Sequence, residues 1–297
     1  MRISELFKAG NGPVFSFEFF PPKTDAGRTS LLETVAELAR LKPGFVSVTF
    51  GAGGSTRDRT IELVSYIKNR LGLEAMAHLT CVGSSRAELT GILDRLEAEG
   101  IENVIALRGD PPAGQTDFVC HPDGLAYACN LLQLIREQGR PFCLAAAGYP
   151  ETHIEAASAD ADLRNLVGKV ASGAEVIITQ LFFDNSFYFD FVERARAAGL
   201  TVPIVAGIMP ITNVAQIERF TKLCGASIPT ELRARLDPVR DDSEAVAKIG
   251  VDHAITQCED LLRSGAPGIH FYTLNRSRST HDILLRLRKD EPWRART

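Results

Sequence analysis

The stretch VFSFEFFPPK, residues 14–23, decides how this chain can fold. Counting every second residue places Phe15, Phe17 and Phe19 on one face of an extended strand and Glu18 on the other. In a half-exposed antiparallel strand the Glu18 face would be wet, the usual meaning of such alternation. If both faces are covered, the carboxyl is buried and its neutral, proton-donating form is favoured. The rest of the sequence must distinguish these alternatives.

Composition places the chain among proteins with a large core. It has 297 residues, 45% of them hydrophobic, and a formal net charge of −4, which makes nucleic acid an unfavourable partner. The sequence lacks a signal peptide pattern and an apolar run of membrane-spanning length, so we expect a cytoplasmic protein with no membrane partner. Six scattered cysteines without a C-x-x-C pair predict reduced thiols, and no histidine pattern proposes a metal site.

Eight short apolar runs alternate with helical patterns along the chain. We expect strands at residues 14–19, 45–50, 74–80, 103–108, 142–147, 175–182, 203–208 and 268–273. Eight β-then-α units in this length favour one closed (β/α)8 TIM barrel, a single catalytic domain over residues 1–297, with a doubly wound open sheet as the alternative. The long interval 212–266 predicts two or three extra helices between strands 7 and 8.

In a barrel, the phenylalanines of the first strand face the helices, and Glu18 faces the interior near the carboxyl end, where barrel active sites lie. The other strand ends add further polar groups to the same rim: Thr49, His78, Arg108 with Asp110, Tyr149 with His153, Gln180, and Tyr272 with Asn275 and Arg276. Each has an ordinary alternative, such as a satisfied core histidine at position 78. Their shared placement is the stronger indication of a site.

The residues alone leave the chemistry open. No lysine lies within or directly after a predicted strand, which disfavours a Schiff-base aldolase, and there is no G-x-S-x-G elbow. The glycine-rich GAGGST, residues 51–56, fits neither a dinucleotide fingerprint nor a phosphate loop. The alternatives are a barrel lyase or metal-assisted hydrolase that uses Glu18, Asp110 and the histidines, and a folate-binding or scaffold protein without turnover.

Seven ordered motifs bring a family into view: SFEFFPPK, VSVTFGAGGSTRDRT, AHLTC, ALRGDPP, ITQLFFDN, GIMPIT and GIHFYTLNR. Together they resemble the bacterial-type, flavin-dependent methylenetetrahydrofolate reductases over nearly the whole chain. The resemblance implies FAD, with NADH or NADPH as co-substrate, and ping-pong hydride transfer that reduces 5,10-methylenetetrahydrofolate to 5-methyltetrahydrofolate for methionine synthesis. It also implies a chain without the regulatory domain of longer eukaryotic relatives, and we expect a homo-oligomer, the default for such barrels.

The resemblance also implies residue roles. Glu18 matches the proton donor, and Asp110 matches an aspartate beside both flavin and pterin. The substrate-binding set is Asp110, Gln180, Gln216, Phe220, Tyr272 and Arg276. The cofactor-binding set is Thr49, with a nicotinamide contact, and the flavin positions Phe50, Ala52, His78, Arg108, Gly109, Asp110, Tyr127, Ala128, Tyr149, His153, Asp162, Asn165 and Lys169.

One position departs from the family pattern. Relatives often carry a second basic residue beside the lysine, where this chain has Gly168. We expect Lys169 to bear more of the charge of the FAD diphosphate, with a solvated lysine on a helix as the alternative.

Overall fold

Eight parallel strands close into a barrel in chain order. A computed structural model of the chain describes residues 1–50, 57–110 and 119–294. Strand β8 pairs with β1 and completes the ring, with Ser16 opposite His270 and Glu18 opposite Tyr272. The predicted (β/α)8 barrel is therefore confirmed, and the open sheet is wrong. The strands are β1 (Val14–Phe19), β2 (Phe45–Val48), β3 (Ala75–Thr80), β4 (Asn103–Leu107), β5 (Cys143–Gly148), β6 (Val176–Thr179), β7 (Ile204–Ile208) and β8 (Gly268–Tyr272).

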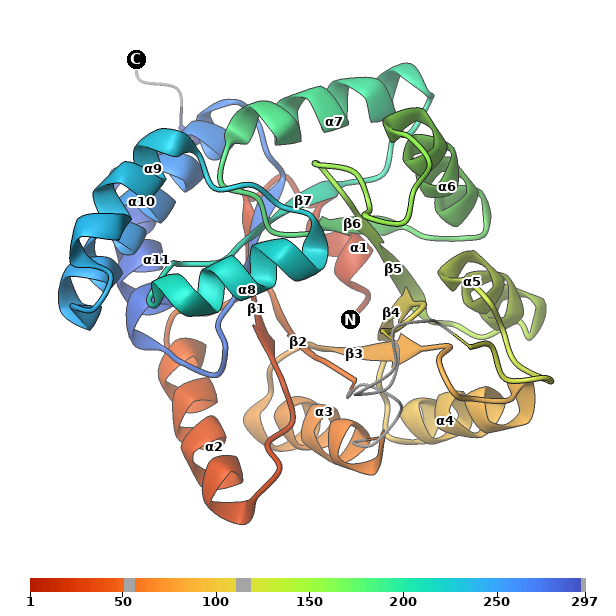
Figure 1. Ribbon diagram of the computed structural model, residues 1–297. Coiled ribbons are helices and arrows are strands. Elements are labelled where there is room, and N and C mark those ends of the chain that lie inside the picture. The colour runs from red at the N-terminus through yellow and green to blue at the C-terminus, as the bar shows by residue number, and fades with distance from the viewer. Residues whose placement is uncertain (51–56, 111–118, 295–297) are drawn as a thin grey trace.

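Helices surround the barrel and follow the strands in alternation (Figure 1). Three elements, α8, α9 and α10, with the short turn η2, fill the interval between β7 and β8, as the sequence predicts. The helices are α1 (Ile3–Leu6), α2 (Asp25–Ala39), α3 (Arg57–Leu71), α4 (Arg86–Ala98), α5 (Ala128–Glu137), α6 (Ala159–Ala171), α7 (Asn185–Ala197), α8 (Val214–Cys224), α9 (Thr230–Leu236), η2 (Asp237–Val239), α10 (Ser243–Arg263) and α11 (Arg278–Asp290).

Strands β2 and β6 end earlier than the apolar runs that predict them. Thr49 and Gln180 stand just beyond the last strand residues. Each still donates its backbone N–H to the neighbouring strand, to Phe19 and Gly148 respectively, at 2.8 Å. Both residues directly follow the carboxyl ends of their strands, so they stand at the rim of the barrel.

The alternation of β1 divides its side chains between two environments. Phe15, Phe17 and Phe19 are buried in the apolar layer between strands and helices. Ser16 is fully buried inside the barrel, where its hydroxyl lies 2.7 Å from Nδ1 of His270. Both faces of β1 are thus covered, and the half-exposed antiparallel strand is wrong.

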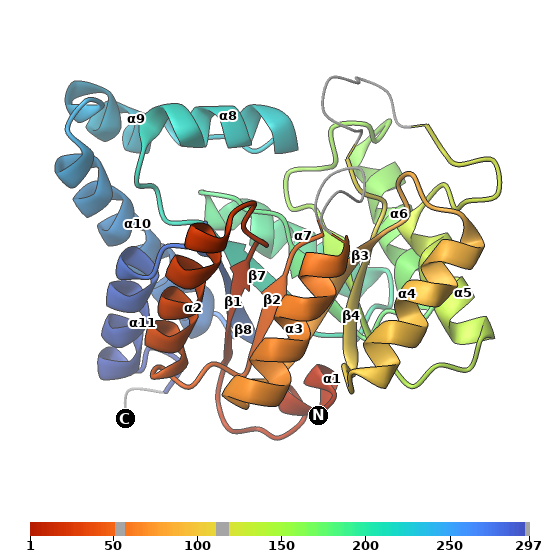
Figure 2. The same cartoon turned by 90° about the horizontal axis from the view of Figure 1, so that it is seen from below.

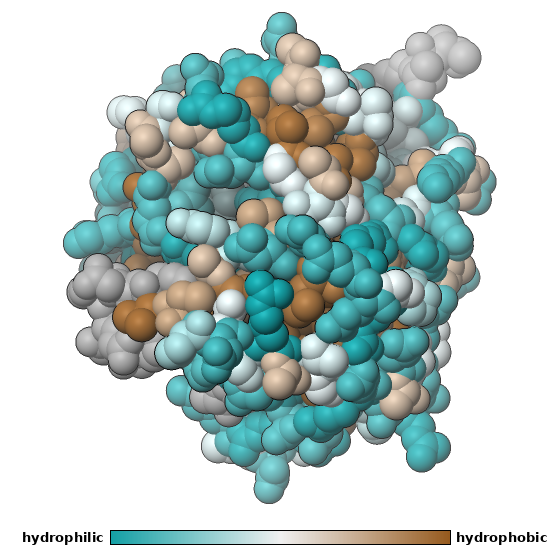
Figure 3. Space-filling view, turned by 90° about the vertical axis from the view of Figure 1, so that its right-hand side faces the viewer, coloured by the Kyte–Doolittle hydropathy of each residue, from teal (hydrophilic) through white to brown (hydrophobic). Residues whose placement is uncertain are grey.

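The outer surface of the molecule differs from this apolar interior. The face seen in Figure 3 is predominantly hydrophilic, with apolar residues in patches.

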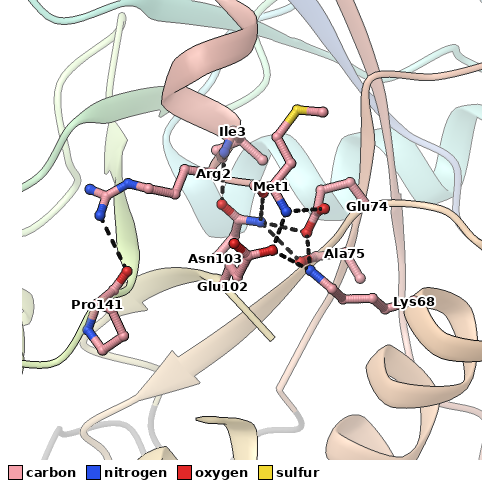
Figure 4. Close-up of polar contacts among 9 residues, drawn as sticks. All are labelled: Met1, Arg2, Ile3, Lys68, Glu74, Ala75, Glu102, Asn103 and Pro141. Atoms are coloured by element: carbon pink, nitrogen blue, oxygen red, sulfur yellow. Dashed lines mark hydrogen bonds and ion pairs between the residues drawn. The ribbon is translucent and has the colours of Figure 1, made fainter. Parts of the chain in front are cut away.

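Helix α1 lies at the end of the barrel opposite α8 (Figure 2). There the side chain of Asn103, buried on β4, accepts a hydrogen bond from Ile3 N at 2.8 Å and donates to Met1 O and Glu74 Oε1 at 3.0 and 2.8 Å. Lys68 links Glu74 and Glu102 beside it (Figure 4). The Asn103 amide therefore helps to hold the N-terminal segment over the base of the barrel, together with the pairing of the N-terminal ammonium and Glu74.

We predict that Asn103→Ala lowers the free energy of unfolding by about 1 to 3 kcal/mol, because it leaves the buried N–H of Ile3 without its acceptor. Urea unfolding followed by circular dichroism measures the change. The matched control is Asn69→Ala, an exposed amide with two hydrogen bonds on α3, for which we expect about 0.5 kcal/mol or less. Equal losses in the two variants would contradict the role of Asn103.

Candidate active site

Glu18 lies inside the barrel among imidazole rings. Its Oε2 atom lies 3.4 Å from Nε2 of His78 on β3 and 3.6 Å from Nε2 of His270 on β8. Ser47 of β2 bridges the two rings, with Oγ 3.3 Å from His78 and 3.4 Å from His270. The Glu18 side chain is 19% exposed, and those of the histidines 8% and 1%. Three strands therefore bring one accessible carboxyl against two buried rings.

The histidine on β3 is neutral near neutral pH. Burial lowers the pKa of His78 to about 4, and the neighbouring charges of Glu18, which favours protonation, and of His270, which opposes it, have smaller effects. The contact between Glu18 and His78 is therefore a polar contact with a neutral imidazole rather than an ion pair. The alternative expected for position 78 is a satisfied core histidine. The burial of the ring agrees with that alternative, but the ring contacts Glu18, the predicted proton donor.

Tyr272 forms one wall beside this cluster. Its hydroxyl donates to the carbonyl oxygen of Thr179 on β6 at 2.6 Å, and its ring lies edge-on to His270 at a centroid distance of 5.5 Å. Gly207 of β7 makes this possible, because a Cβ there would come within 2.8 Å of the Tyr272 ring and 2.1 Å of Thr179 O. The Tyr272 side chain thus crosses over β7 at Gly207 and links β8 to β6.

A second cluster lies at the ends of β4 and β5. Arg108 pairs with Glu155 through both carboxylate oxygens, one contact being 2.7 Å. These hydrogen bonds are the main cause that raises the pKa of the Arg108 guanidinium, and the charge of Asp110 adds to it. Asp110 itself is exposed. His153 packs edge-on against Tyr149 at 4.6 Å, and burial raises the pKa of that phenol to about 12.

Helix α6 supplies the remaining charged groups of this second cluster. Asp162 is buried and accepts a hydrogen bond from the backbone N–H of His153 at 3.0 Å. The Lys169 amine donates to Ala147 O at 2.9 Å and lies 5.1 Å from the centroid of the Tyr149 ring. Burial lowers its pKa, while Asp162 opposes that effect. A solvated surface lysine, the alternative from sequence, is therefore wrong.

Helix α8 carries two of the predicted substrate residues. Figure 2 shows it lying across the end of the barrel at which the strands finish. Gln216 and Phe220 are half-buried on it, and Phe220, like Tyr272, packs against an apolar cluster that includes Met209 and Ile211. The helix thus forms a roof over the rim, on the side of β7 and β8.

The other predicted residues stand outside these two clusters of polar side chains. Thr49 is half-buried and its carbonyl accepts from the Thr60 hydroxyl at 2.9 Å, while the Gln180 side chain accepts from the backbone of Leu181 at 2.8 Å. Phe50 and Ala128 are buried, Gly109 has a φ of 88°, and the exposed members are Tyr127 at 61%, Asn165 and Arg276. Ala52 lies outside the described residues.

Sequence reasoning missed three residues of these clusters. His270 and Ser47 face the barrel interior from strands read as apolar, and Glu155 lies in a loop without a motif. The alternation of GIHFYT could have identified His270, because residues 268, 270 and 272 share one face.

Within residues 1–50, 57–110 and 119–294, no group of three His, Cys, Asp or Glu side chains could hold a metal ion. None of the helices there has the length and apolar composition needed to cross a membrane.

Comparison with known proteins gives a consistent result. The family model described as methylenetetrahydrofolate reductase matches residues 2–288. A maize protein named methylenetetrahydrofolate reductase (NADH) 1 is 41% identical over 318 residues, covering 100% of this chain and 54% of its own length. The 5,10-methylenetetrahydrofolate reductase of Escherichia coli K12 is 41% identical over 268 residues, covering 90% of this chain and 88% of its own. The chain thus spans about half the length of the plant relatives.

Solved structures share the fold at low sequence identity. An uncharacterized protein from Clostridium thermocellum, described as binding two copies of 5-methyl-5,6,7,8-tetrahydrofolic acid, aligns with a TM-score of 0.65 and 17% identity, covering 98% of this chain and 99% of that one. A 7,8-dihydropteroate synthase from Vibrio fischeri aligns with a TM-score of 0.52 and 11% identity, covering 96% and 95%. These likenesses establish the barrel alone.

The buried imidazole of His78 predicts a specific pH dependence. Its folded pKa of about 4 lies below the ordinary value of 6.5, so the unfolded chain binds more protons between those values and stability falls as pH decreases through this window. We expect this residue to contribute a loss of about 3 kcal/mol in the free energy of unfolding between pH 7 and pH 4. Urea unfolding across that range should show a smaller loss in His78→Gln than in wild type, and His281→Gln on α11 is the control. Identical pH slopes in wild type and His78→Gln would contradict the assignment.

Proposed function

Because the chain belongs to the methylenetetrahydrofolate reductase family, we propose that it reduces 5,10-methylenetetrahydrofolate to 5-methyltetrahydrofolate with electrons from NADH or NADPH. The observation that carries the proposal is Glu18, an accessible carboxyl among buried rings at the carboxyl end of the barrel. The names of the plant relatives favour NADH as the electron source. The family match favours a reductase over the lyase and hydrolase alternatives.

The second cluster has the groups that FAD would require. The half-buried Lys169 ammonium lies against a carbonyl and a ring, so its charge can meet a diphosphate oxygen, and Tyr127 presents an exposed ring just before α5. Gly109 lets the backbone pass close to Val82, because a Cβ at position 109 would lie 2.6 Å from the Val82 side chain. We propose that these residues, with Tyr149, His153 and Asp162, hold FAD. When bound, FAD supplies a hydride acceptor and donor, so that two substrates can take turns by a ping-pong mechanism.

Glu18 would act on the folate side. Reduction of the methylene bridge requires its five-membered ring to open, and a carboxyl that delivers a proton to the departing nitrogen assists that opening. The rings of His78 and His270, with Ser47, restrict the carboxyl to one region of the barrel interior. Glu18 therefore combines a fixed position with access to a bound substrate.

Asp110 and the rim residues would position the substrates. An exposed aspartate at the end of β4 can accept hydrogen bonds from the amino and ring N–H groups of a pterin. Gln180, Gln216 and Arg276 supply an amide or a cation for the polar parts of the folate, and Phe220 and Tyr272 supply aromatic faces. Thr49 stands at the rim for the nicotinamide.

The wider setting follows the same proposal. We propose that the barrel over residues 1–297 is the catalytic domain and that its product supplies methyl groups for methionine synthesis. A cytoplasmic location and a homo-oligomeric state stay predictions from the sequence.

We predict that Glu18→Gln retains the fold and the flavin but slows folate reduction by about 10² to 10⁴, because an amide preserves the shape and removes the transferable proton. Reduction of the flavin by NADH requires no such proton and should proceed at close to the wild-type rate. Stopped-flow absorbance measures the two half-reactions separately in the same preparation. Equal slowing of both would exclude Glu18 as the folate-side acid.

We predict that Lys169→Met weakens FAD binding about tenfold or more, equivalent to roughly 1.5 to 3 kcal/mol for a hydrogen bond to a charged group. Methionine retains an unbranched stem beside Tyr149 and removes the charge. Flavin fluorescence during dilution measures the dissociation constant.

Two further variants make that result specific. Lys222→Met removes an exposed lysine from α8 and should leave the dissociation constant of FAD unchanged. Gly168→Lys should strengthen binding, because a Cβ at this position meets no heavy atom within 4 Å and a second cation can be added without a clash at its base. If Lys169→Met binds FAD as tightly as Lys222→Met does, Lys169 has no role at the phosphates.

A further inference from the structure

The loop that follows β5 meets the C-terminal end of α8. The backbone N–H and the hydroxyl of Ser227, three residues beyond α8, both donate to Oε2 of Glu151, the former at 2.9 Å. Burial raises the pKa of this carboxyl, and its other oxygen, Oε1, is buried without a hydrogen-bond partner among the described residues. A half-buried carboxyl that directs one oxygen at two donors of a single residue forms a specific contact between two distant segments.

A glycine brings the same two segments together. Gly225 ends α8 in the left-handed conformation, with a φ of 78°, and its N–H bonds to Thr221 O at 2.9 Å. A Cβ at this position would lie 2.5 Å from Cγ2 of Ile154 and 3.7 Å from Thr152 O. The chain after β5 and the end of α8 therefore touch at a second point. We call the contacts of Glu151 with Ser227 and of Ile154 with Gly225 the clasp.

The β5 side of the clasp is fixed by its own hydrogen bonds. Thr152 N bonds to Tyr149 O at 3.1 Å, and the ring and backbone of His153 bind Glu155 N and Asp162 at 3.1 and 3.0 Å. Glu155 is held in turn by Arg108. This loop keeps its shape without help from α8.

The α8 side depends more on the clasp. Val214 and Ile217, in the first half of the helix, are buried in the apolar cluster with Met209. In the second half Thr221 is still buried and Cys224 packs against the same cluster while only partly buried, but Leu223 is 61% exposed. Phe220, a proposed substrate contact, lies between the anchored half and this exposed end. A change in the clasp should therefore move Phe220 relative to the barrel.

We propose that Glu151 is a positioning residue that fixes the C-terminal half of α8, and with it Phe220, over the substrate site. The inference rests on the proposed function for the meaning of that site. Glu151 touches no reacting group in this proposal. It acts through Ser227, and its loss should weaken substrate binding rather than the chemical step or the retention of flavin.

Three variants of the full-length protein test the inference. Glu151→Ala removes the acceptor, and Glu151→Gln retains an oxygen at the same reach. Glu218→Ala is the matched control, since it removes an acid of the same helix that pairs with Arg233 and Arg240 on the outside. For each we would measure kcat and KM with methylenetetrahydrofolate, the flavin content, thermal unfolding, and amide hydrogen exchange of residues 214–224.

We expect Glu151→Ala to raise KM about five- to twentyfold with kcat changed by less than about twofold, because hydrogen bonds to a charged acceptor are lost outside the reacting atoms. Amides near the end of α8 should exchange about tenfold faster. Glu151→Gln should stay within about threefold of wild type in KM, and Glu218→Ala should match wild type in both measurements.

The result separates two failures. If Glu151→Ala matches Glu218→Ala in exchange and in KM, or loses kcat and flavin instead, the positioning role is wrong. If the flavin-loaded wild type does not reduce methylenetetrahydrofolate at all, the proposed function fails. Hydrogen exchange would then still decide whether the clasp holds α8, because that measurement needs no substrate.

Discussion

The structure depends on the closure of a parallel barrel, which covers both faces of every strand. A side chain that points inward cannot reach bulk water except at the rim, so a polar group there needs a partner from another strand. The inward set of Ser16, Glu18, Ser47, His78 and His270 meets this requirement by contacting one another. The carboxyl at the rim end of this set has both a fixed position and an opening to solvent. The same constraint that stabilises the barrel thus holds this carboxyl where, under the proposed function, it acts as the acid.

The buried apolar side chains form three separate clusters with different structural roles. One cluster joins the barrel to its surrounding helices, and another fills the base of the barrel interior around Ile3, Phe45 and Met76. The third lies above the strand ends, under α8 and α9. The first two are deeply buried and give rigidity. The third includes residues at the proposed substrate site, so the stability of the roof and the shape of the site rest on the same contacts.

Periodicity predicted the barrel well because its signal is local. The bounds of β1 agree with the sequence pattern, and the eight units appear in order, since strand alternation and helical spacing are properties of neighbouring residues. The clusters were less accessible. Lys169 reads as a surface residue until α6 is placed against β5, and the pairing of Arg108 with Glu155 joins residues 47 positions apart. The family resemblance supplied roles for single residues, but the arrangement of His270, Ser47 and Glu18 is a property of the closed sheet.

The two ends of the clasp differ in how they are held, and under the proposed function that difference has a use. A cofactor that stays bound through both half-reactions needs a site that keeps its shape. The loop after β5 has such support, because His153 packs against Tyr149 and its backbone N–H bonds to Asp162 of α6. Two substrates of different shape that take turns at one place need a wall that can adjust. Val214 and Ile217 keep the first half of α8 in place, and the clasp with Glu151 holds the second half, with Phe220, over the site, so a change in that one contact adjusts this wall. A rigid flavin site beside an adjustable roof is the arrangement that alternation between substrates requires.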